Sequence, residues 1–346
     1  MSMVSVDNNA YVLHMPSEVT ASAENAVMDA YARSSPGSIR NLILNFSQVE
    51  CLNSAGASLL VKLYVQAKQR RQLLKAVGLS EHYQQVFVLI GLNRAMLVDL
   101  GGADTGAKAG RPRDAAHWAK PVSRLKVPGM PTQAINLNVE GRRVVGPIQG
   151  FGPMWQKTYR VRLGATATPL EVIKILKEDF PKFQPPENRF YPSEGGIKPG
   201  EVVLINGSTP VGLICTGVIV LYVDDESFTF ITPQGHPLSG WVTFTAYEDE
   251  GCTVAQVQGL IRSGDPLYEL GFRVGGSKAQ ENIWKHVLAA LAKQLGVEAQ
   301  VDMEKTCIDS KLQWSAARNV WHNAQIRTII YSVGARIRRV VGLVKR

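Results

Sequence analysis

Few residues of this 346-residue chain have the types and the spacing that chemistry needs. We find no G-x-S-x-G nucleophile elbow, no Walker A loop, no G-x-G-x-x-G after an expected strand and no H-E-x-x-H. The four cysteines and six histidines are scattered without the spacing of metal ligands. We therefore expect no metal site and no cofactor, and a protein that acts by binding rather than an enzyme.

One polar turn could still carry chemistry. The turn Asn53-Ser54-Ala55-Gly56 precedes a helix expected from about Ala57 to Arg71. The first N–H groups of a helix lack partners and lie at the positive end of its dipole, so they would stabilise a phosphoryl group on a hydroxyl there. Such a group would add about two negative charges to an interface. The simpler interpretation is that Asn53 and Ser54 only cap the helix.

This turn belongs to an alternation of strands and helices over residues 1–100. Compact apolar runs, typical of buried strands, alternate with segments whose apolar residues recur at helical spacing. Gly91-Leu92 ends the last of these expected helices. The order predicts α/β layers, with helices packed on a sheet. The expected strands are Ala10–Met15, Leu42–Phe46 and Leu73–Gly78, and the expected helices are Ser17–Arg33, the one after the turn, and one capped by Ser80.

In its order of elements and in two short motifs, this segment resembles a STAS domain, the fold of anti-sigma factor antagonists. The motifs are the turn at 53–56, where the family has Asp-Ser-Ser/Thr-Gly, and the Gly91-Leu92 helix ending. The resemblance implies a protein partner, such as an anti-sigma factor, a switch kinase or another STAS protein.

The turn departs from the family pattern at its functional position. The family phosphorylates the Ser or Thr directly before the glycine, and this chain has Ala55 there. Asn53 replaces the preceding Asp, and Ser54 keeps a hydroxyl in the other slot. The resemblance therefore implies partner binding without the usual phosphorylation switch, either constitutive or controlled elsewhere.

The rest of the chain predicts a linker and a second domain. Residues 101–145 are rich in Gly, Pro, Ala and Arg, which is typical of a basic linker. Residues 146–300 predict a strand at Met154–Leu163, a helix capped by Thr168, a run of antiparallel strands and a long helix at Ser277–Leu295. This α+β order, with a sheet that curls around the last helix, resembles the helix-grip, START-like superfamily, also called SRPBCC or polyketide cyclase-like.

The START-like resemblance implies an apolar cavity between the sheet and the last helix, which would hold a lipid or another hydrophobic small molecule. It also implies the alternative function, a cyclase or accessory-type enzyme, or a lipid-binding protein, that acts through this cavity. Aromatic residues on strands are more often plain core, and His236 lies in a Pro-Gly loop that suits a turn as well as a cavity mouth. The candidate lining residues are Trp155, Tyr159, Arg160, Phe230, His236, Trp241, Phe244 and Tyr268, with Tyr247 and Glu269 beside them.

The net charge of +9 is concentrated outside the two expected domains. Residues 101–145 hold eight basic and three acidic residues, and residues 304–346 hold nine and two. Residues 301–346 predict a basic tail helix with an apolar stripe at Ile326, Ile330, Val333, Ile337, Val340 and Val344. The flanking cations are Arg327, Arg336, Arg338 and Arg339.

Three surfaces fit this stripe: an anionic membrane, a partner protein, or the second domain of the same chain. Nucleic acid is not expected, because no recognisable reading motif accompanies the basic residues. The sequence has no visible secretory signal, no apolar run long enough to span a bilayer and no CxxC pair, so we expect a cytosolic protein that is at most peripheral at a membrane.

Overall fold

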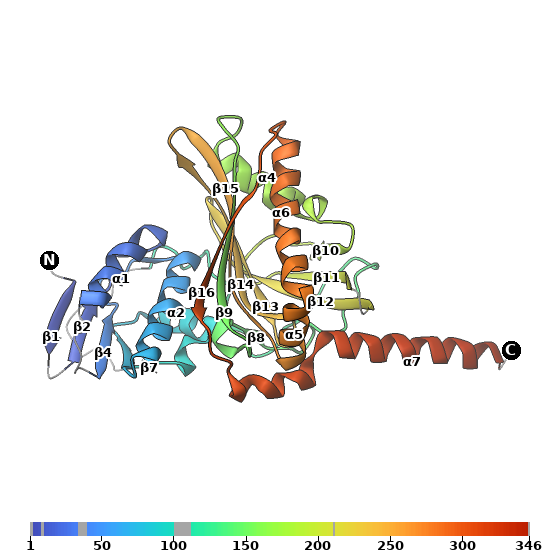
Figure 1. Cartoon of the computed structure of the whole chain (residues 1–346), viewed down its shortest axis with the longest axis horizontal. Coiled ribbons are helices and arrows are strands. Elements are labelled where there is room, and N and C mark those ends of the chain that lie inside the picture. The colour runs from blue at the N-terminus through green and yellow to red at the C-terminus, as the bar shows by residue number, and fades with distance from the viewer. Residues whose placement is uncertain (1–2, 8–9, 34–39, 100–111, 210–211, 345–346) are drawn as a thin grey trace. The chain divides into compact units, whose positions relative to one another are not determined.

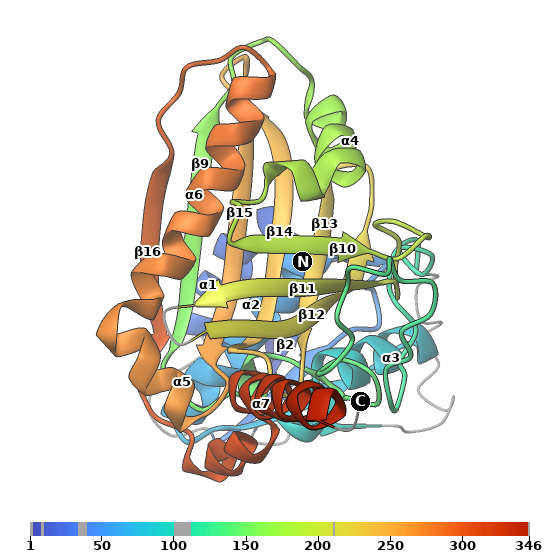
Figure 2. The same ribbon diagram turned by 90° about the vertical axis from the view of Figure 1, so that its right-hand side faces the viewer.

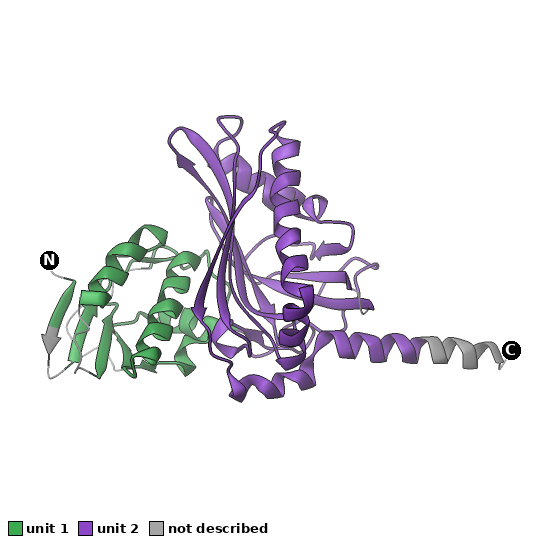
Figure 3. Cartoon of the chain, viewed as in Figure 1, with its two compact units in different colours: residues 1–121 green, residues 122–346 purple. Residues whose placement is uncertain are grey.

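The computed structural model of the chain describes residues 3–7, 10–33, 40–99, 112–209 and 212–344, with side chains at all of these positions except 6, 7 and 336–344. The chain forms two compact units, residues 1–121 and residues 122–346 (Figure 3). Each unit has its own sheet and its own core, and each is described by itself.

The first unit is an α/β layer structure, as the alternation of its elements predicted. Its sheet has the order β1-β2-β4-β6-β7, in which β1 is antiparallel to β2 and the other neighbours are parallel. The strands are β1 (Val4–Asp7), β2 (Ala10–His14), β4 (Asn41–Asn45), β6 (Leu73–Val77) and β7 (Leu97–Val98), and a separate pair joins β3 (Glu18–Val19) to β5 (Cys51–Leu52). The helices are η1 (Ala21–Ala23), α1 (Glu24–Arg33), α2 (Ser54–Gln69), α3 (Glu81–Ile90) and η2 (Leu92–Arg94) (Figure 1).

The helix α2 is the centre of this unit because it is buried over most of its length. Leu59, Leu60 and Leu63 are fully buried, as their helical spacing indicated. Lys62 is also buried, and its ammonium lies 2.6 Å from Glu24 of α1, so a charge pair joins the two helices. The following helix α3 is capped by Ser80 and ends at Gly91 in the left-handed conformation, with φ at 81°.

The first unit extends beyond residue 100, because a segment that we expected to be linker packs onto it. Trp118 is buried, and its indole Nε1 donates to the Asp114 carboxylate and to the Leu52 carbonyl, both at 2.9 Å. Tyr83 of α3 donates to the other Asp114 oxygen at 2.9 Å. These contacts connect a Pro- and Arg-rich segment to β5 and α3, so residues 112–121 are not a free linker. The expected linker over 101–145 is also wrong for residues 122–145, which belong to the second unit and include the buried Val139.

The second unit is built on one antiparallel sheet, which has nine strands in the described part of the chain. The strand order is β10-β11-β12-β13-β14-β15-β9-β16, and β8 pairs with β13. The strands are β8 (Val144–Val145), β9 (Met154–Arg162), β10 (Asn188–Pro192), β11 (Val202–Thr209), β12 (Gly212–Val223), β13 (Ser227–Pro233), β14 (Leu238–Asp249), β15 (Cys252–Ser263) and β16 (Asp302–Asp309).

Two helices cover one face of this sheet, which gives the helix-grip arrangement. Figure 2 looks onto this face, with α4 (Pro169–Asp179) and the long α6 (Ser277–Gln294) in front of the strands. Thr168 caps α4 together with Glu171 in a reciprocal capping box, as the Thr-Pro start suggested. The remaining helical segments are η3 (Pro147–Gln149), η4 (Phe180–Phe183), α5 (Pro266–Gly271), the π-turn η5 (Phe272–Gly276), η6 (Trp314–His322) and α7 (Ala324–Val344).

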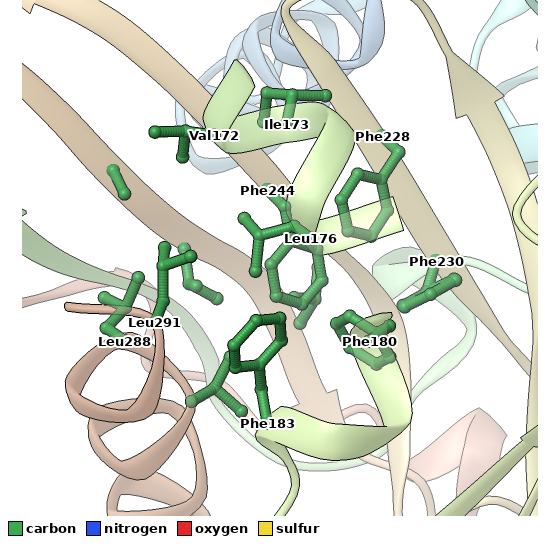
Figure 4. Close-up of a cluster of buried hydrophobic side chains, with 14 of the residues drawn as sticks. Val172, Ile173, Leu176, Phe180, Phe183, Phe228, Phe230, Phe244, Leu288 and Leu291 are labelled. Carbon is green, nitrogen blue, oxygen red and sulfur yellow. The ribbon is translucent and has the colours of Figure 1, made fainter. Parts of the chain in front are cut away.

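The core of this unit lies between the sheet and the two helices. Phe180 is its centre, because its ring lies edge-on to the rings of Phe190, Phe228, Phe230 and Phe244, with centroids 5.1 to 5.8 Å apart (Figure 4). Leu288 and Leu291 close the cluster from α6. The middle of the fold is therefore filled by side chains.

One part of the tail is a strand and not a helix. Residues 302–309 form β16, which pairs with β9 along the edge of the sheet. The segment escaped the sequence analysis because an edge strand packs little of its surface, and its alternation is charged rather than apolar. The helical part of the tail begins only at Trp314 and is divided at Asn323 into η6 and α7.

Candidate functional site

The turn before α2 is closed by its own side chains. The amide oxygen of Asn53 accepts from Gly56 N at 3.1 Å, so Asn53 is the N-cap of α2 and Ser54 is its first helical residue. Ser54 is 1% exposed, and its carbonyl accepts from the Ser58 hydroxyl at 3.1 Å. Ala55 is half-buried. The cap is therefore Asn53, and the hydroxyl of the turn faces the interior.

Gly56 lets α2 begin directly against β3. A Cβ atom at this position would lie 1.9 Å from the carbonyl oxygen of Val19, closer than any side chain can come. The close approach explains why a glycine ends the turn, with no need for an unusual backbone angle.

A pocket of about 350 Å³ opens in the second unit at the end of the helix-grip core where α6 begins. Strands β9 and β15 form one wall, and α5, the π-turn and the first turn of α6 form the other. Its lining is apolar at Pro153, Trp155, Leu238, Ile261 and Phe272, and polar at Lys157, Arg262, Ser263, Glu269, Arg273, Ser277, Gln280 and Lys305.

Lys157 is a buried charge in the wall of this pocket. Its side chain is 4% exposed, and its ammonium donates to Glu281 at 2.7 Å, to Gln280 at 2.9 Å and to Ser277 at 3.0 Å. Burial lowers the pKa of Lys157, and the Glu281 carboxylate opposes that shift. Burial alone would raise the pKa of Glu281, but the Lys157 ammonium outweighs it and holds that pKa below its usual value. At 2.7 Å the two side chains form a salt bridge in the wall of the pocket.

Lys305 lies nearer the mouth of the pocket, on the neighbouring strand β16. Its ammonium is 4.3 Å from the ring centroid of Trp155, a cation–π contact, and 3.7 Å from the Glu281 carboxylate. Lys305 pairs directly with Lys157 across the strands, so two ammonium groups share one carboxylate. The two lysines and Glu281 together carry one net positive charge, beside the half-buried ring of Trp155.

The other charged groups of the pocket are paired. Arg262 is buried and binds the Asp309 carboxylate and the Gly152 carbonyl. Glu269 accepts from the Ser263 hydroxyl and from Arg273, both at 2.7 Å. A Cβ at Gly152 would lie 2.1 Å from the Ser263 hydroxyl and 2.2 Å from the Glu269 carboxylate, so a side chain there would displace this pair.

The structure separates the cavity candidates from one another. Trp155 and Glu269 line the pocket. Tyr159, Phe230 and Phe244 belong to the filled core. The Tyr159 hydroxyl and the Trp284 indole nitrogen are buried there without a hydrogen-bond partner among the described residues, and burial raises the pKa of Tyr159.

Two candidates lie on the opposite face of the sheet from this core. Arg160 alternates with Tyr159 along β9, and its guanidinium donates to Gln256 at 2.8 Å and to Glu304 at 3.3 Å. Trp241 alternates with Val242 along β14 and is 1% exposed on that other face. Neither side chain lines the pocket. The spacing of the residues predicts the strands but not which face of each strand points toward the helices. Tyr247 is 38% exposed near the end of β14.

His236 and Tyr268 hold loops together. The His236 ring accepts from Leu238 N at 3.0 Å, and burial lowers the pKa of His236 to about 4, so the ring is neutral. The Tyr268 hydroxyl accepts from Gln325 N at 3.0 Å, which ties α5 to the start of α7. The simpler interpretation of His236 as a turn residue fits these contacts.

The tail surface is described up to residue 335. Arg327 is exposed, and its Nε donates to Asn138 at 3.0 Å. Arg336, Arg338 and Arg339 lie outside the residues whose side chains the structure describes. In the described part of the chain, no helix combines the length and the apolar character that crossing a bilayer requires.

The polar half of the pocket was missed by the sequence analysis. Lys157 carries the signal that could have revealed it, because Trp155, Lys157, Tyr159 and Val161 share one face of an alternating strand. A lysine on an otherwise apolar face of a strand is a charge that must find a buried partner. The partners Ser277, Gln280 and Glu281 lie 120 or more residues away, so only the fold brings them together.

These features define the two units as a STAS-like α/β domain and a helix-grip α+β domain. Residues 2–99 match the family model described as "Mlab, STAS domain". The first unit thus contains a STAS domain, which covers less than a third of the chain. No curated protein matches the chain.

Solved structures resemble parts of the chain at low identity. RsbS S58E of Moorella thermoacetica is 13% identical, with a TM-score of 0.26 over 31% of this chain and 88% of its own. The di-domain ARO/CYC StfQ from the steffimycin biosynthetic pathway is 13% identical, with a TM-score of 0.33 over 41% of this chain and 50% of its own. Protein Ms6760 from Mycobacterium smegmatis is 16% identical, with a TM-score of 0.31 over 41% of this chain and 90% of its own. These likenesses carry nothing about function.

Proposed function

We propose that this chain is a non-enzymatic regulatory protein that joins two binding modules. The STAS domain binds a protein partner, in the manner of an anti-sigma factor antagonist, and does so without a phosphorylation switch at the α2 turn. The helix-grip domain binds an amphipathic small molecule. The observation that carries the proposal for the STAS domain is the α2 turn, where Ala55 takes the place of the phosphorylated residue and Ser54 is only 1% exposed.

A kinase must reach the hydroxyl that it modifies. Ser54 is buried in the first turn of α2, which the absence of a side chain at Gly56 allows to lie directly against Val19. Asn53 uses its side chain to cap the helix, so the positive end of the helix dipole is already satisfied by a neutral group. These features support an α2 turn that is not phosphorylated. They also support partner binding that is constitutive or controlled at another site.

Partner capture tests the proposal for the STAS domain. The full chain with Ala55→Glu places a carboxylate where the family carries its phosphoryl group. The matched control is Ala26→Glu, which puts the same charge on an exposed position of α1. We expect the wild type and Ala26→Glu to retain the same partner from a lysate of the source cells, and Ala55→Glu to lose it. Equal capture by all three proteins would reject the α2 turn as the binding surface.

The pocket supports an amphipathic ligand with an anionic group. Trp155, Phe272 and Ile261 offer an apolar wall. Each of the other cations is paired with an acid within hydrogen-bond distance, whereas Lys305 shares the Glu281 carboxylate with Lys157 and lies 3.7 Å from it. A carboxylate or phosphate that entered the mouth would meet this surplus positive charge, while its apolar part would cover Trp155.

A fluorescent medium-chain fatty acid and the corresponding alcohol are suitable probes for this pocket. We expect the acid to bind more tightly than the alcohol, and Lys305→Gln to remove the difference. Lys198→Gln, at an exposed lysine away from the pocket, is the control. Native mass spectrometry of the purified chain would then show any ligand that stays bound through purification. Failure of both probes to bind would refute the proposal for the second domain without touching that for the first.

A further inference from the structure

The helix α7 is seated on the second unit by small and polar side chains. Ala324 and Thr328 are buried against β12, and Cys215 N of that strand donates to the Thr328 hydroxyl at 3.2 Å. Asn138 donates to the same hydroxyl at 3.1 Å and to the Ala324 carbonyl at 3.2 Å. Asn323 caps the helix through Ile326 N and binds Asp265 at 2.9 Å. These contacts fix the rotation of α7 about its own axis.

That rotation turns the apolar stripe away from the protein. Ile326, Ile329, Ile330 and Val333 are 37%, 41%, 66% and 50% exposed. At 100° per residue these four positions lie opposite Ala324 and Thr328. In the sequence the same stripe continues through Ile337, Val340 and Val344. Over the side chains that the structure describes, up to residue 335, the stripe therefore does not pack on the second domain, which is one of the three surfaces considered for it from the sequence.

Two exposed indoles precede this stripe. Trp314 and Trp321, both on η6, are 72% and 80% exposed. A tryptophan combines a large apolar surface with one polar N–H, and this combination suits the boundary between lipid and water better than bulk water. The segment from residue 314 to the end of α7 is continuous in the chain, and it contains both the exposed tryptophans and the exposed apolar helix face.

The charge of the same segment has one sign. Residues 310–346 contain eight basic and no acidic residues. Arg327 and Arg338 fall on one edge of the stripe at helical spacing, and Arg336 falls on the other. A helix with an apolar face and basic edges matches the two parts of an anionic bilayer surface, the acyl boundary and the headgroups.

We propose that the exposed face of α7, formed by Ile326, Ile329, Ile330 and Val333, lies on the surface of an anionic phospholipid bilayer, with Trp314 and Trp321 at the interface. A second copy of the helix fits less well. The stripe has the four- and three-residue steps of a coiled coil, but its flanks contain arginines and no acidic partner, so two copies would repel each other. Ile329 also widens the apolar face beyond the narrow seam that paired helices use.

Vesicle co-sedimentation of the full chain tests this proposal. The probes are vesicles of phosphatidylcholine alone and of phosphatidylcholine with phosphatidylglycerol. The test variant is Ile330→Asp, and its control is Leu170→Asp, because Leu170 is 57% exposed on α4 and the two substitutions make closely similar changes. Circular dichroism melting of both variants confirms that they fold.

We expect wild type and Leu170→Asp to bind the anionic vesicles, to bind phosphatidylcholine weakly, and to be released by salt. Ile330→Asp loses a large apolar contact and adds a repelled charge, so its partition coefficient should fall about 10- to 100-fold. Absence of binding by the wild type, or equal binding by Ile330→Asp, would overturn the proposal. A wild-type dimer that Ile330→Asp converts to a monomer, without vesicle binding by either, would assign the face to a second copy and would overturn it as well.

Discussion

The buried pair of Lys157 and Glu281 leads to an asymmetric prediction about stability. Glu281→Gln keeps the shape of the side chain but leaves the Lys157 ammonium, 4% exposed, with only neutral acceptors. Lys157→Met removes the buried charge and keeps most of the aliphatic stem. Glu281 then remains 19% exposed, and it still accepts from Ser277 at 3.0 Å and lies 3.7 Å from Lys305.

The expected magnitudes follow from what each substitution leaves behind. A buried ammonium without its counterion costs about 3 kcal/mol in the free energy of unfolding, so we expect Glu281→Gln to lower stability by about that amount. Lys157→Met leaves a partly hydrated carboxylate with another cation nearby, and should cost about 1 kcal/mol. The double substitution should cost less than the sum of the two, with a coupling of about 2 kcal/mol.

Urea unfolding monitored by tryptophan fluorescence measures these differences. Five of the six tryptophans lie in the second unit, so the signal reports mainly on the unit that contains the pair. Asp179→Asn is the control, because it breaks the ion pair of Asp179 with Lys182, whose side chain is 72% exposed, and should change stability little. If Lys157→Met proved more destabilising than Glu281→Gln, or if the two effects were additive, the account of a desolvated ammonium held by one carboxylate would be wrong.

Three further predictions concern other parts of the chain. Trp118→Phe removes the N–H that serves Asp114 and Leu52, so we expect a loss of about 1–3 kcal/mol in the first unit, seen as faster hydrogen exchange in α2 and α3 while the second unit is unchanged. Gly152→Ala places a methyl group against the Glu269 carboxylate and the Ser263 hydroxyl, so these two side chains must rotate, and binding of the fatty-acid probe, measured by fluorescence, should weaken. The pKa of Glu281 is lowered in the folded state, so its contribution to stability is present above its unfolded pKa of about 4.3 and is lost as the pH falls through the folded value. Acid unfolding of Glu281→Gln should therefore be less steep than that of the wild type, and equal slopes would contradict this assignment.

Local signals in the sequence were sufficient for most of the fold. The alternation of β2, β4 and β6 with α1, α2 and α3 follows from nearest-neighbour chemistry, as do the Ser80 and Gly91 ends of α3, the Thr168 cap of α4 and the run from β11 to β15, because caps and alternation act within a few residues. The short strands β1, β3, β5 and β7 were not expected, and β3 lies where the helix over Ser17–Arg33 was expected to begin. The strand β16 did not follow, because an edge strand with charged residues lacks the apolar alternation that marks a strand.

The sites were less predictable than the elements that carry them. The motif at 53–56 placed the α2 turn correctly, but the depth of Ser54 depends on contact with Val19 in another strand. Among the aromatic candidates, sequence spacing does not distinguish Trp155, at the pocket, from Phe244, in the core. That difference arises from where α6 crosses the sheet and where it leaves β9 uncovered.

The sequence by itself determined that residues 326–344 would form a helix with one apolar stripe and basic edges, because helical periodicity is a property of the residue order. Only the tertiary structure decided where that stripe points. Thr328 and Ala324 make the hydrogen bonds and the close packing against β12, and a helix can offer one face to its own domain only by turning the opposite face outward.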